Sequence, residues 1–119
     1  MNPETIIHLS IVKYLTLLEN QRRLFFFHPA NGGARTAREG ALLKRMGVKP
    51  GVADLLICRP GGKVAFVEIK SGKGRESISQ KETAERIRSL GFEPHVVRSL
   101  DEMIALCEGW GLVRVRAAP

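Results

Sequence analysis

The chain has 119 residues, of which 44% are hydrophobic and 26% are charged, which is the composition of a single globular domain. That composition excludes a disordered, collagen-like or coiled-coil protein, and no apolar run approaches the roughly 18 residues that a membrane span needs. Nineteen Lys and Arg residues against twelve Asp and Glu residues give a formal charge of +7, which favours a polyanionic partner, above all nucleic acid.

The N-terminus does not have the pattern of a secretory signal. Its first charged residue is acidic (Glu4), and Lys13 interrupts the apolar stretch. Cys58 and Cys107 lie far apart and form no CxxC pattern, and no Cys/His spacing resembles a zinc site. The sequence therefore predicts a cytoplasmic protein that is not secreted, contacts no membrane and has no disulfide framework.

The first predicted helix is the best marked element of the N-terminal third. Asn2 suits the cap position, Pro3 the first turn and Glu4 the positive end of the helix dipole, and apolar residues recur at helical spacing to about Asn20. The next expected elements are a buried aromatic strand (24–28), a loop (29–33) and a second helix closed by Gly47 (36–46).

A hairpin is predicted in the middle of the chain. Two strand-like runs, 52–58 and 63–70, flank a Pro-Gly-Gly turn at 60–62. A polar loop follows at 71–75, and its two glycines and two cations suit a flexible segment that lies along a DNA backbone. The alternative for this loop is an ordinary surface connection.

The C-terminal part is predicted to hold two capped helices and two strands. A capping box of Ser79 with Glu82 predicts a helix from Ser79 to Gly91, and a second box of Ser99 with Glu102 predicts the last helix. The strands are expected at 93–97 and, as an edge strand, at 112–115. The predicted architecture is one α/β domain over residues 1–119, a mixed β-sheet with a central hairpin flanked by α-helices.

Two acids interrupt the otherwise apolar strands of the hairpin. Asp54 lies in the first strand and Glu68 in the second, and Lys70 follows Glu68 by two residues on the same sheet face. A two-residue turn would place Asp54 opposite Ile69, whereas a three-residue turn would place it opposite Glu68. We take the three-residue turn, because only that register brings the three side chains to one face.

The acid pair points to a metal, because two carboxylates about 5 Å apart repel unless a cation lies between them. Oxygen ligands favour Mg²⁺ or Mn²⁺ over zinc. A lysine beside such a cation can orient or help deprotonate a water, and these groups on a basic domain indicate phosphodiester hydrolysis. The alternative is a buried Asp–Lys–Glu ion network that only fixes the strand register.

The arrangement of Asp54, a strand–turn–strand and then Glu68-Ile69-Lys70 resembles the PD-(D/E)XK nuclease signature, with Ala53 in place of its proline. The surrounding segments are similar, in order, to those of the virus-type replication-repair nuclease domain, VRR-NUC. They are NGGAR (31–35), GALLKRMGV (40–48), GVADL (51–55), FVEIK (66–70) and Ser79-Gln80. The resemblance runs from about Glu4 to Asp101.

This resemblance implies a restriction-endonuclease-like core and a divalent-metal-dependent nuclease. It makes Asp54 and Glu68 ligands of Mg²⁺ or Mn²⁺, joined by the backbone carbonyl of Ile69, and it makes Lys70 the catalytic lysine. Its stand-alone members imply a homodimer that acts on branched DNA such as Holliday junctions. The length and type of the chain suit a phage protein.

The resemblance also places two further residues at the active site. Glu4 matches a glutamate of the first helix, although an acid in a first turn is equally explained by the helix dipole. Gln80 matches an active-site glutamine, although by itself it is a polar residue in a first turn. His8 stands where the family usually has a glutamine, which leaves that contact open.

Basic residues are concentrated in segment 22–49, which holds seven Lys and Arg residues and one acid. The residues expected to contact nucleic acid are Asn31, Arg35, Arg38, Lys44, Arg45, Lys73 and Arg75. The alternatives are a solvated basic face with no partner and, for Asn31, a local turn cap.

The function predicted from the sequence is a metal-dependent DNA endonuclease with no small-molecule cofactor. The alternative is a non-catalytic nucleic-acid-binding module that retains the nuclease fold.

Overall fold

The computed structural model describes residues 1–30 and 36–117. The elements are α1 (Pro3–Asn20), β1 (Phe25–Phe27), α2 (Ala37–Arg45), β2 (Leu55–Arg59), β3 (Lys63–Ile69), α3 (Ile78–Ser89), β4 (Glu93–Val97) and α4 (Leu100–Gly109). The predicted order of helices and strands is confirmed as far as α4. No described helix has the length and apolar character to cross a membrane.

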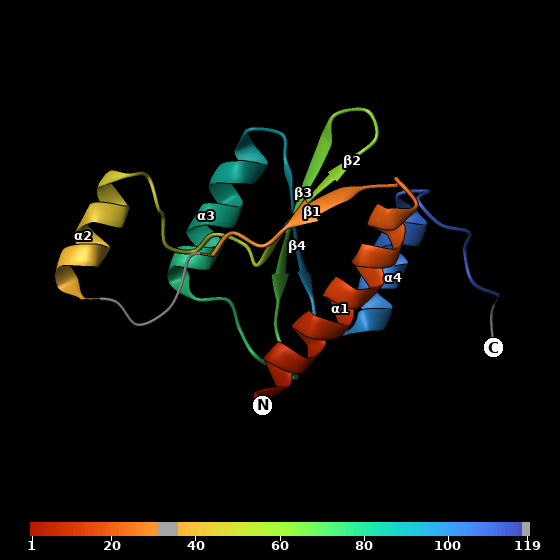
Figure 1. Cartoon of the computed structure of the whole chain (residues 1–119), viewed down its shortest axis with the longest axis horizontal. Coiled ribbons are helices and arrows are strands. Elements are labelled where there is room, and N and C mark those ends of the chain that lie inside the picture. The colour runs from red at the N-terminus through yellow and green to blue at the C-terminus, as the bar shows by residue number, and fades with distance from the viewer. Residues whose placement is uncertain (31–35, 118–119) are drawn as a thin grey trace.

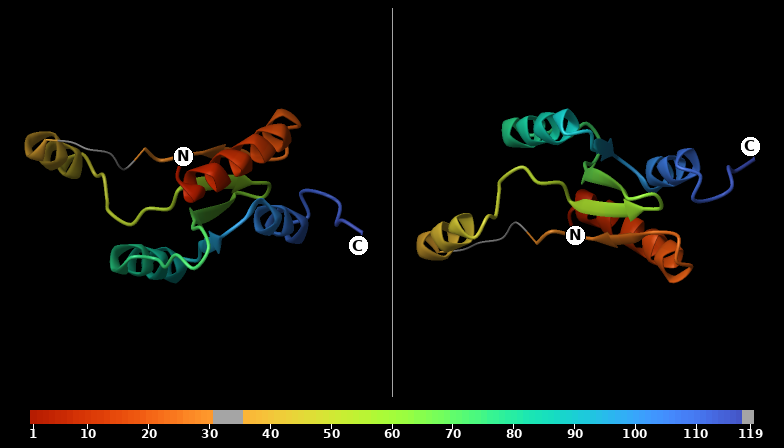
Figure 2. Two further views of the ribbon diagram at one scale, coloured as in Figure 1. Left: turned by 90° about the horizontal axis from the view of Figure 1, so that it is seen from below. Right: turned by 90° about the horizontal axis from the view of Figure 1, so that it is seen from above.

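The strands form one mixed sheet in the order β1-β2-β3-β4. The first three strands are antiparallel, and β4 runs parallel to β3. Helices α1 and α4 cover one face of the sheet, and α3 lies against the other face (Figures 1 and 2). The predicted α/β class, with a central hairpin in a mixed sheet flanked by helices, is confirmed.

The core lies between the sheet and the pair α1 and α4. Alternate residues of the hairpin, such as Ile57 and Val67, are fully buried there, as are Ile11 and Met103 from the two helices. The intervening residues of β3, Phe66 and Glu68 among them, point to the face that carries α3, because side chains alternate along a strand. The hydrophobic alternation thus separates a core face from the face that holds the acids.

The aromatic strand β1 was expected to be buried, and this is wrong. Phe25 and Phe27 are 59% and 43% exposed, while Phe26 packs against the core. β1 is an edge strand paired only with β2, and α3 packs against β4 rather than over β1. The outer face of β1 is therefore left open, and the strand is half-buried instead of buried.

The start of α3 differs from the expected one by two residues. Its cap is Ser77, whose hydroxyl accepts a hydrogen bond from the Gln80 N–H at 3.1 Å, while the Gln80 side-chain oxygen accepts from the Ser77 N–H at 2.8 Å. Ser-x-x-Gln and Ser-x-x-Glu are both capping boxes, so the sequence offers two overlapping starts. The structure uses the first, and Ser79 lies inside the helix.

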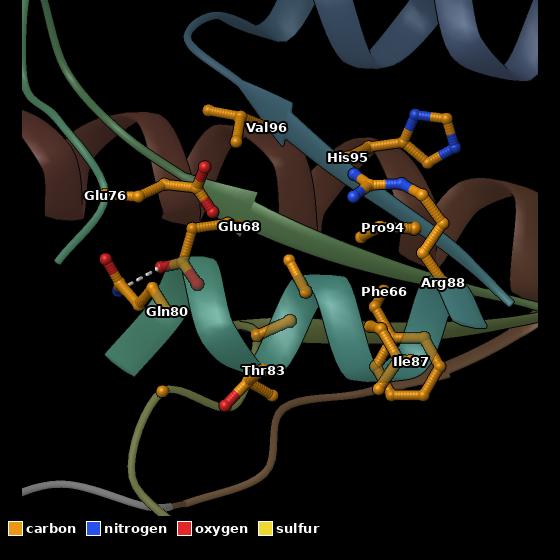
Figure 3. Close-up of a pocket in the computed structure, with 13 residues that line it drawn as sticks. Phe66, Glu68, Glu76, Gln80, Thr83, Ile87, Arg88, Pro94, His95 and Val96 are labelled. Carbon is orange, nitrogen blue, oxygen red and sulfur yellow. Dashed lines mark hydrogen bonds between the residues drawn. The ribbon is translucent and has the colours of Figure 1, made fainter. Parts of the chain in front are cut away.

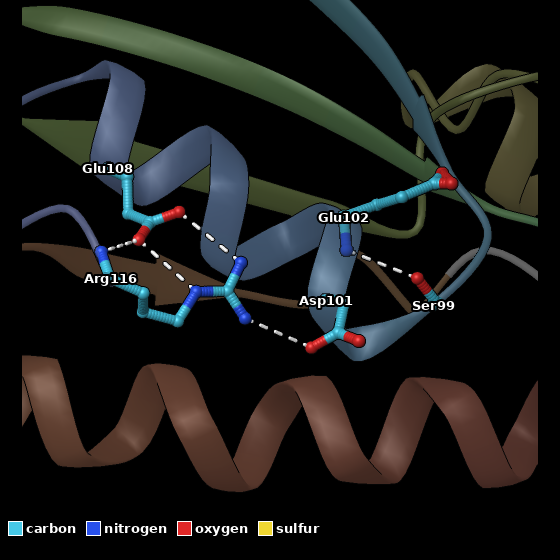
Figure 4. A network of polar contacts seen from close by, with 5 residues as sticks. All are labelled: Ser99, Asp101, Glu102, Glu108 and Arg116. Atoms are coloured by element: carbon cyan, nitrogen blue, oxygen red, sulfur yellow. Dashed lines mark hydrogen bonds and ion pairs between the residues drawn. The ribbon is translucent and has the colours of Figure 1, made fainter. Parts of the chain in front are cut away.

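The predicted edge strand at 112–115 does not form. Residues 112–115 pair with no strand, and the carbonyl of Leu112 accepts a hydrogen bond from the Arg23 guanidinium at 2.6 Å. Further on, Arg116 donates to the carboxylates of Glu108 and Asp101 and ties this segment to α4 (Figure 4). Side chains, rather than a fifth strand, hold the C-terminal segment in place.

Helix α2 forms as predicted, with Thr36 as its cap, but it extends away from the body of the domain (Figures 1 and 2). It packs against no other described helix or strand. Its apolar residues Leu42 and Met46 are 54% and 72% exposed. Helix α2 is therefore amphipathic with an exposed apolar side, and exposed apolar surfaces of this kind are typical of interaction sites.

Candidate active site

The hairpin register brings the two acids together as predicted. Arg59 pairs with Lys63 across a three-residue turn, and Leu55 pairs with Val67. Asp54 directly precedes β2, so continuing the register by one residue places it opposite Glu68. The three-residue turn is confirmed.

Asp54 is held by two hydrogen bonds that come from different elements. Its carboxylate Oδ2 accepts from the Ile69 N–H of β3 at 2.7 Å. Its backbone carbonyl lies 2.6 Å from Nδ1 of His28, and because a carbonyl can only accept, that nitrogen carries the proton. Asp54 is therefore held from both sides of β2, by β3 and by the residue that follows β1.

Glu68 is the one charged residue that is buried among the residues described, with 6% of its surface exposed. Burial, and after it the neighbouring carboxyl of Asp54, raises the pKa of Glu68 to about 8, while the charge of Lys70 lowers that pKa. Glu76 acts in the same direction as Asp54. The site thus carries more negative charge than its surroundings can stabilise, which favours a bound proton or a cation.

Gln80 connects the cap of α3 to this carboxylate. Its side-chain nitrogen donates to Oε1 of Glu68 at 2.9 Å, while its side-chain oxygen closes the capping box with Ser77. The structure therefore brings Gln80 to the acid pair, and it also explains why the residue stands in the first turn. Gln80 is a polar residue in the first turn, as the sequence alone indicated, and its hydrogen bond to Glu68 lies where the resemblance expected an active-site glutamine.

Lys70 follows β3, and its backbone N–H donates to the carbonyl of Val97 at 3.1 Å. Its positive charge lowers the pKa of Glu68. Gly74 lies against its aliphatic chain, since a Cβ at Gly74 would be 3.8 Å from Cβ and Cδ of Lys70. The structure thus brings Lys70 together with the acid pair.

The loop after Lys70 is tethered, whereas its glycines had suggested flexibility. The guanidinium of Arg98 donates to the carbonyls of Gly72 and Gly74 at 3.1 and 2.7 Å. Sequence reasoning missed Arg98, because nothing in the sequence places it beside a loop 24 or more residues earlier. Lys73 and Arg75 of this loop are exposed.

Two histidines flank Asp54 on the side of α1. The rings of His8 and His28 meet edge to face, with centroids 5.0 Å apart. Burial lowers the pKa of His8, while the charges of Asp54 and of Glu4 oppose that shift. Glu4 lies one turn before His8, and within the described part of the chain its carboxylate forms no hydrogen bond or ion pair with Asp54 or Glu68. His28 escaped the sequence analysis because the pairing of β1 with β2 brings it to Asp54.

The donor set suits a hard cation, although it is small. Among residues 1–30 and 36–117, no three Asp, Glu, His or Cys side chains converge on one metal position. Mg²⁺ typically takes only one or two protein carboxylates and completes its shell with water and substrate phosphates. Asp54 and Glu68 could supply those two, with oxygen atoms alone and with negative charge gathered around Glu68.

The predicted nucleic-acid contacts do not form one group. Lys73 and Arg75 stand near Lys70 in sequence, whereas Arg38, Lys44 and Arg45 are exposed on the projecting helix α2. Asn31 and Arg35 lie outside the described residues. The basic residues are therefore distributed over two separate surfaces.

A cavity of about 170 Å³ adjoins the acid pair (Figure 3). It lies between α3 and the strands β3 and β4, and Glu68 and Gln80 stand at one end of it. Phe66 and Ile87 contribute to its apolar wall, and Arg88 lies toward the other end. No pattern in the sequence indicated this cavity.

Two solved structures similar to this chain are described as a VRR_NUC domain and a VRR_NUC domain protein. The first is 21% identical, with a TM-score of 0.65, and the match covers 92% of this chain and 99% of that chain. The second is 24% identical, with a TM-score of 0.69, and the match covers 92% of this chain and 88% of that chain. No family model and no curated protein matches the sequence. The chain has the fold of these VRR_NUC domains, as the sequence resemblance predicted.

Proposed function

We propose that the protein is a divalent-metal-dependent endonuclease that hydrolyses phosphodiester bonds in DNA. The observation that carries this proposal is the buried carboxylate of Glu68 beside Asp54, with Lys70 and Gln80 around it. The carboxyl groups of Asp54 and Glu76 both raise the pKa of Glu68 and the charge of Lys70 lowers it, and a bound cation would neutralise the negative charge gathered here. The VRR_NUC fold supports the same class of enzyme.

Each residue has a proposed role. Asp54 and Glu68, with the backbone carbonyl of Ile69, would hold Mg²⁺ or Mn²⁺, which when bound supplies an activated water and charge stabilisation at the phosphate. Lys70 orients the attacking water or helps to remove its proton. Gln80 fixes the carboxylate of Glu68 by its hydrogen bond.

Glu4 acts on this site indirectly. Its charge favours the protonated form of His8, which is also influenced by Asp54. We assign Glu4 a supporting role at the edge of the active site rather than a place among the metal ligands.

DNA is the proposed partner because the charge of +7 suits a polyanion. Lys73 and Arg75 are exposed on the loop that follows Lys70, which supports a contact with the backbone near the cleaved bond, and Arg98 holds that loop. Arg38, Lys44 and Arg45 supply a second contact surface on α2. Phosphate contacts of this kind position the DNA without reading its sequence.

We further propose a homodimer that acts on branched DNA, such as a four-way junction. The exposed apolar side of α2, with Leu42 and Met46, is not covered by any helix or strand among residues 1–30 and 36–117. The same chain leaves the outer side of β1 open at Phe25 and Phe27. A two-fold pair that exchanged these surfaces would cover both and would present two active sites to two strands.

The decisive experiment uses labelled duplex, flap, splayed-arm and four-way-junction DNA with Mg²⁺, Mn²⁺ or EDTA. We expect cleavage with either metal, none in EDTA, and a loss of about a hundredfold or more in Lys70→Ala, with binding retained. Lys63→Ala is the matched control, since it removes an exposed lysine at the opposite end of β3 from Lys70. Binding without cleavage by the wild type would instead establish a non-catalytic nucleic-acid-binding module.

The dimer has a separate test. Sedimentation should show a dimer for the wild type and a monomer for Met46→Lys, which places a charge on the apolar side of α2. A wild-type protein that remains a monomer at all concentrations would contradict the dimer and leave the nuclease proposal standing.

A further inference from the structure

The cavity beside Glu68 takes no part in the proposed metal chemistry. It is bounded by α3 on one side and by β3 and β4 on the other, and it extends from Gln80 toward Arg88 (Figure 3). Glu68 belongs both to this cavity and to the acid pair. If the proposed function holds, a group bound in the cavity would therefore lie next to the phosphate at Asp54 and Glu68.

The size and lining of the cavity restrict what can enter. Its volume of about 170 Å³ is below the roughly 300–1,000 Å³ of pockets for drug-sized ligands. Phe66, Ile87, Pro94 and Val96 give it apolar walls. The ring of Phe66 is itself supported edge to face by Phe92, with centroids 5.6 Å apart. One flat group with apolar faces and polar edges, such as a single nucleobase, suits these walls and the polar residues Gln80 and Thr83 beside them, and a base pair is too large.

The two ends of the cavity have opposite charge. Glu68 stands at one end beside Gln80, and Arg88 lies eight residues further along α3, which is about 12 Å on a helix. The guanidinium of Arg88 forms no hydrogen bond or ion pair with any other residue in the described part of the chain. An exposed arginine without a partner beside an apolar slot is suited to a phosphate.

We propose that this slot binds one unpaired nucleotide of the strand that is cut. Its base lies between α3 and β4, the adjoining phosphate on one side reaches the metal-binding acids, and the phosphate on the other side reaches Arg88. Paired and stacked bases cannot enter, so a nucleotide must first leave the duplex. The slot therefore favours flaps and branch points, where unpaired bases are available, over continuous duplex.

Binding can be tested without cleavage. Oligonucleotides with 2-aminopurine, a fluorescent adenine analogue, at one unpaired position are mixed with the wild type in EDTA, and quenching by acrylamide is measured. We expect protection of the unpaired base and none of a paired base in duplex. Ala84→Leu, which fills the slot from α3, should abolish the protection, and Ala84→Ser should retain it.

Arg88→Ala and Arg86→Ala form a matched pair on the last turn of α3, of which only Arg88 lines the cavity. Arg88→Ala should weaken binding of a single strand by about fivefold or more, and Arg86→Ala should not. Both changes are on the surface and leave the core intact, so the comparison does not depend on the folding of Ala84→Leu.

The proposed nucleotide slot would be wrong if Ala84→Leu still protected the unpaired base and the two arginine variants lost equal affinity for the single strand. If the wild type cuts DNA but no base is protected, the slot is wrong and the nuclease stands. If a base is protected and nothing is cut with Mg²⁺ or Mn²⁺, the slot stands and the nuclease is wrong.

Discussion

The side-chain nitrogen of Gln80 donates a hydrogen bond to Glu68 at 2.9 Å, while the other end of the same amide closes the N-terminal cap of α3. A single side chain thus joins a helix start to a buried carboxylate. The position of the carboxylate depends on that helix start, because Glu68 receives this bond from α3 and lies on β3. A change at Gln80 can therefore affect the stability of α3 through the cap and the reaction through the bond to Glu68, and the two effects can be separated.

Gln80→Glu separates the two routes. A glutamate at this position can still accept from the Ser77 N–H and keep the capping box, but it cannot donate to Glu68. We expect α3 to remain capped and cleavage to fall by about tenfold, the loss typical when a residue that orients a metal ligand is removed. Single-turnover cleavage and thermal unfolding measure the two effects.

Gln80→Ala is the companion variant. It removes both bonds, so it should lose cleavage to a similar extent and also lose about 1 kcal/mol of stability from the cap. Wild-type cleavage by Gln80→Glu would show that the bond to Glu68 does not matter for the reaction.

The raised pKa of Glu68 predicts an unusual pH dependence of the stability of the metal-free protein. Its pKa is about 8 in the folded chain and 4.5 when unperturbed, so between these values the folded state holds a proton that the unfolded state has lost. The stabilisation of the folded state by protonated Glu68 is fully present below pH 4.5 and is lost as the pH rises through 8. We expect stability in EDTA to fall with rising pH over this window.

Denaturant unfolding of wild type and Glu68→Gln from pH 4.5 to 8.5 isolates the effect. The difference between the two proteins should change with pH, because Glu68→Gln cannot titrate, and Mg²⁺ should stabilise the wild type more at pH 8 than at pH 5. A constant difference across the window would mean that Glu68 titrates normally.

The sequence was sufficient for those parts of the site that depend on local geometry. The turn at 60–62 decides the register of the hairpin, and the register in turn places Asp54 next to Glu68. The start of α1 at Asn2 followed equally well, since its side chain accepts from the Glu4 N–H at 2.7 Å. Contacts within one hairpin follow from spacing alone, and so does a helix start with a single possible cap, whereas α3 offered two caps and the sequence favoured the wrong one.

Contacts between distant elements could not be predicted in this way. His28 meets Asp54 only because β1 pairs with β2, and Arg98 meets the loop after Lys70 only because β4 lies parallel to β3. The exposure of Phe25 depends on which helix covers which part of the sheet. Such facts depend on tertiary packing, which overrides the local preference of a short apolar run.

The basic side of α2 leads to a prediction about salt. Arg38 and Arg45 are exposed and lie two turns apart on one side of the helix. Replacing both with Ala should weaken binding of a four-way junction and flatten the dependence of log K on log salt by about 0.9 per lost contact. The loss should be similar for all sequences, because phosphate contacts carry no base information.

A control for total charge is available. Lys13→Ala with Lys63→Ala removes the same two charges from exposed positions on α1 and the hairpin, and it should leave the slope nearly unchanged. Parallel slopes for the α2 variant and the wild type would exclude α2 from the DNA interface.

Gly51 fixes the segment before Asp54 against the start of α3. Its φ is +76°, and a Cβ there would lie only 2.5 Å from the carbonyl carbon of Ser79 and 2.9 Å from the Gln80 nitrogen. Both contacts are to backbone atoms, so they cannot be relieved by a change of rotamer. Thr83 adds a hydrogen bond from its hydroxyl to the carbonyl of Pro50 at 3.3 Å. The position of Asp54 relative to Gln80 therefore depends on the absence of a side chain at residue 51.

Gly51→Ala should push the start of α3 away from the segment that leads to Asp54. We expect Mn²⁺ affinity, measured by calorimetry, and cleavage to fall together, by about tenfold or more. Gly47→Ala is the matched control, since Gly47 also has a positive φ, +99°, but nothing lies within 4 Å of the added carbon. It should lose about 1–2 kcal/mol of stability from backbone strain and keep its metal affinity. Equal metal affinities in the two variants would mean that strain alone, and not the close approach to α3, accounts for Gly51.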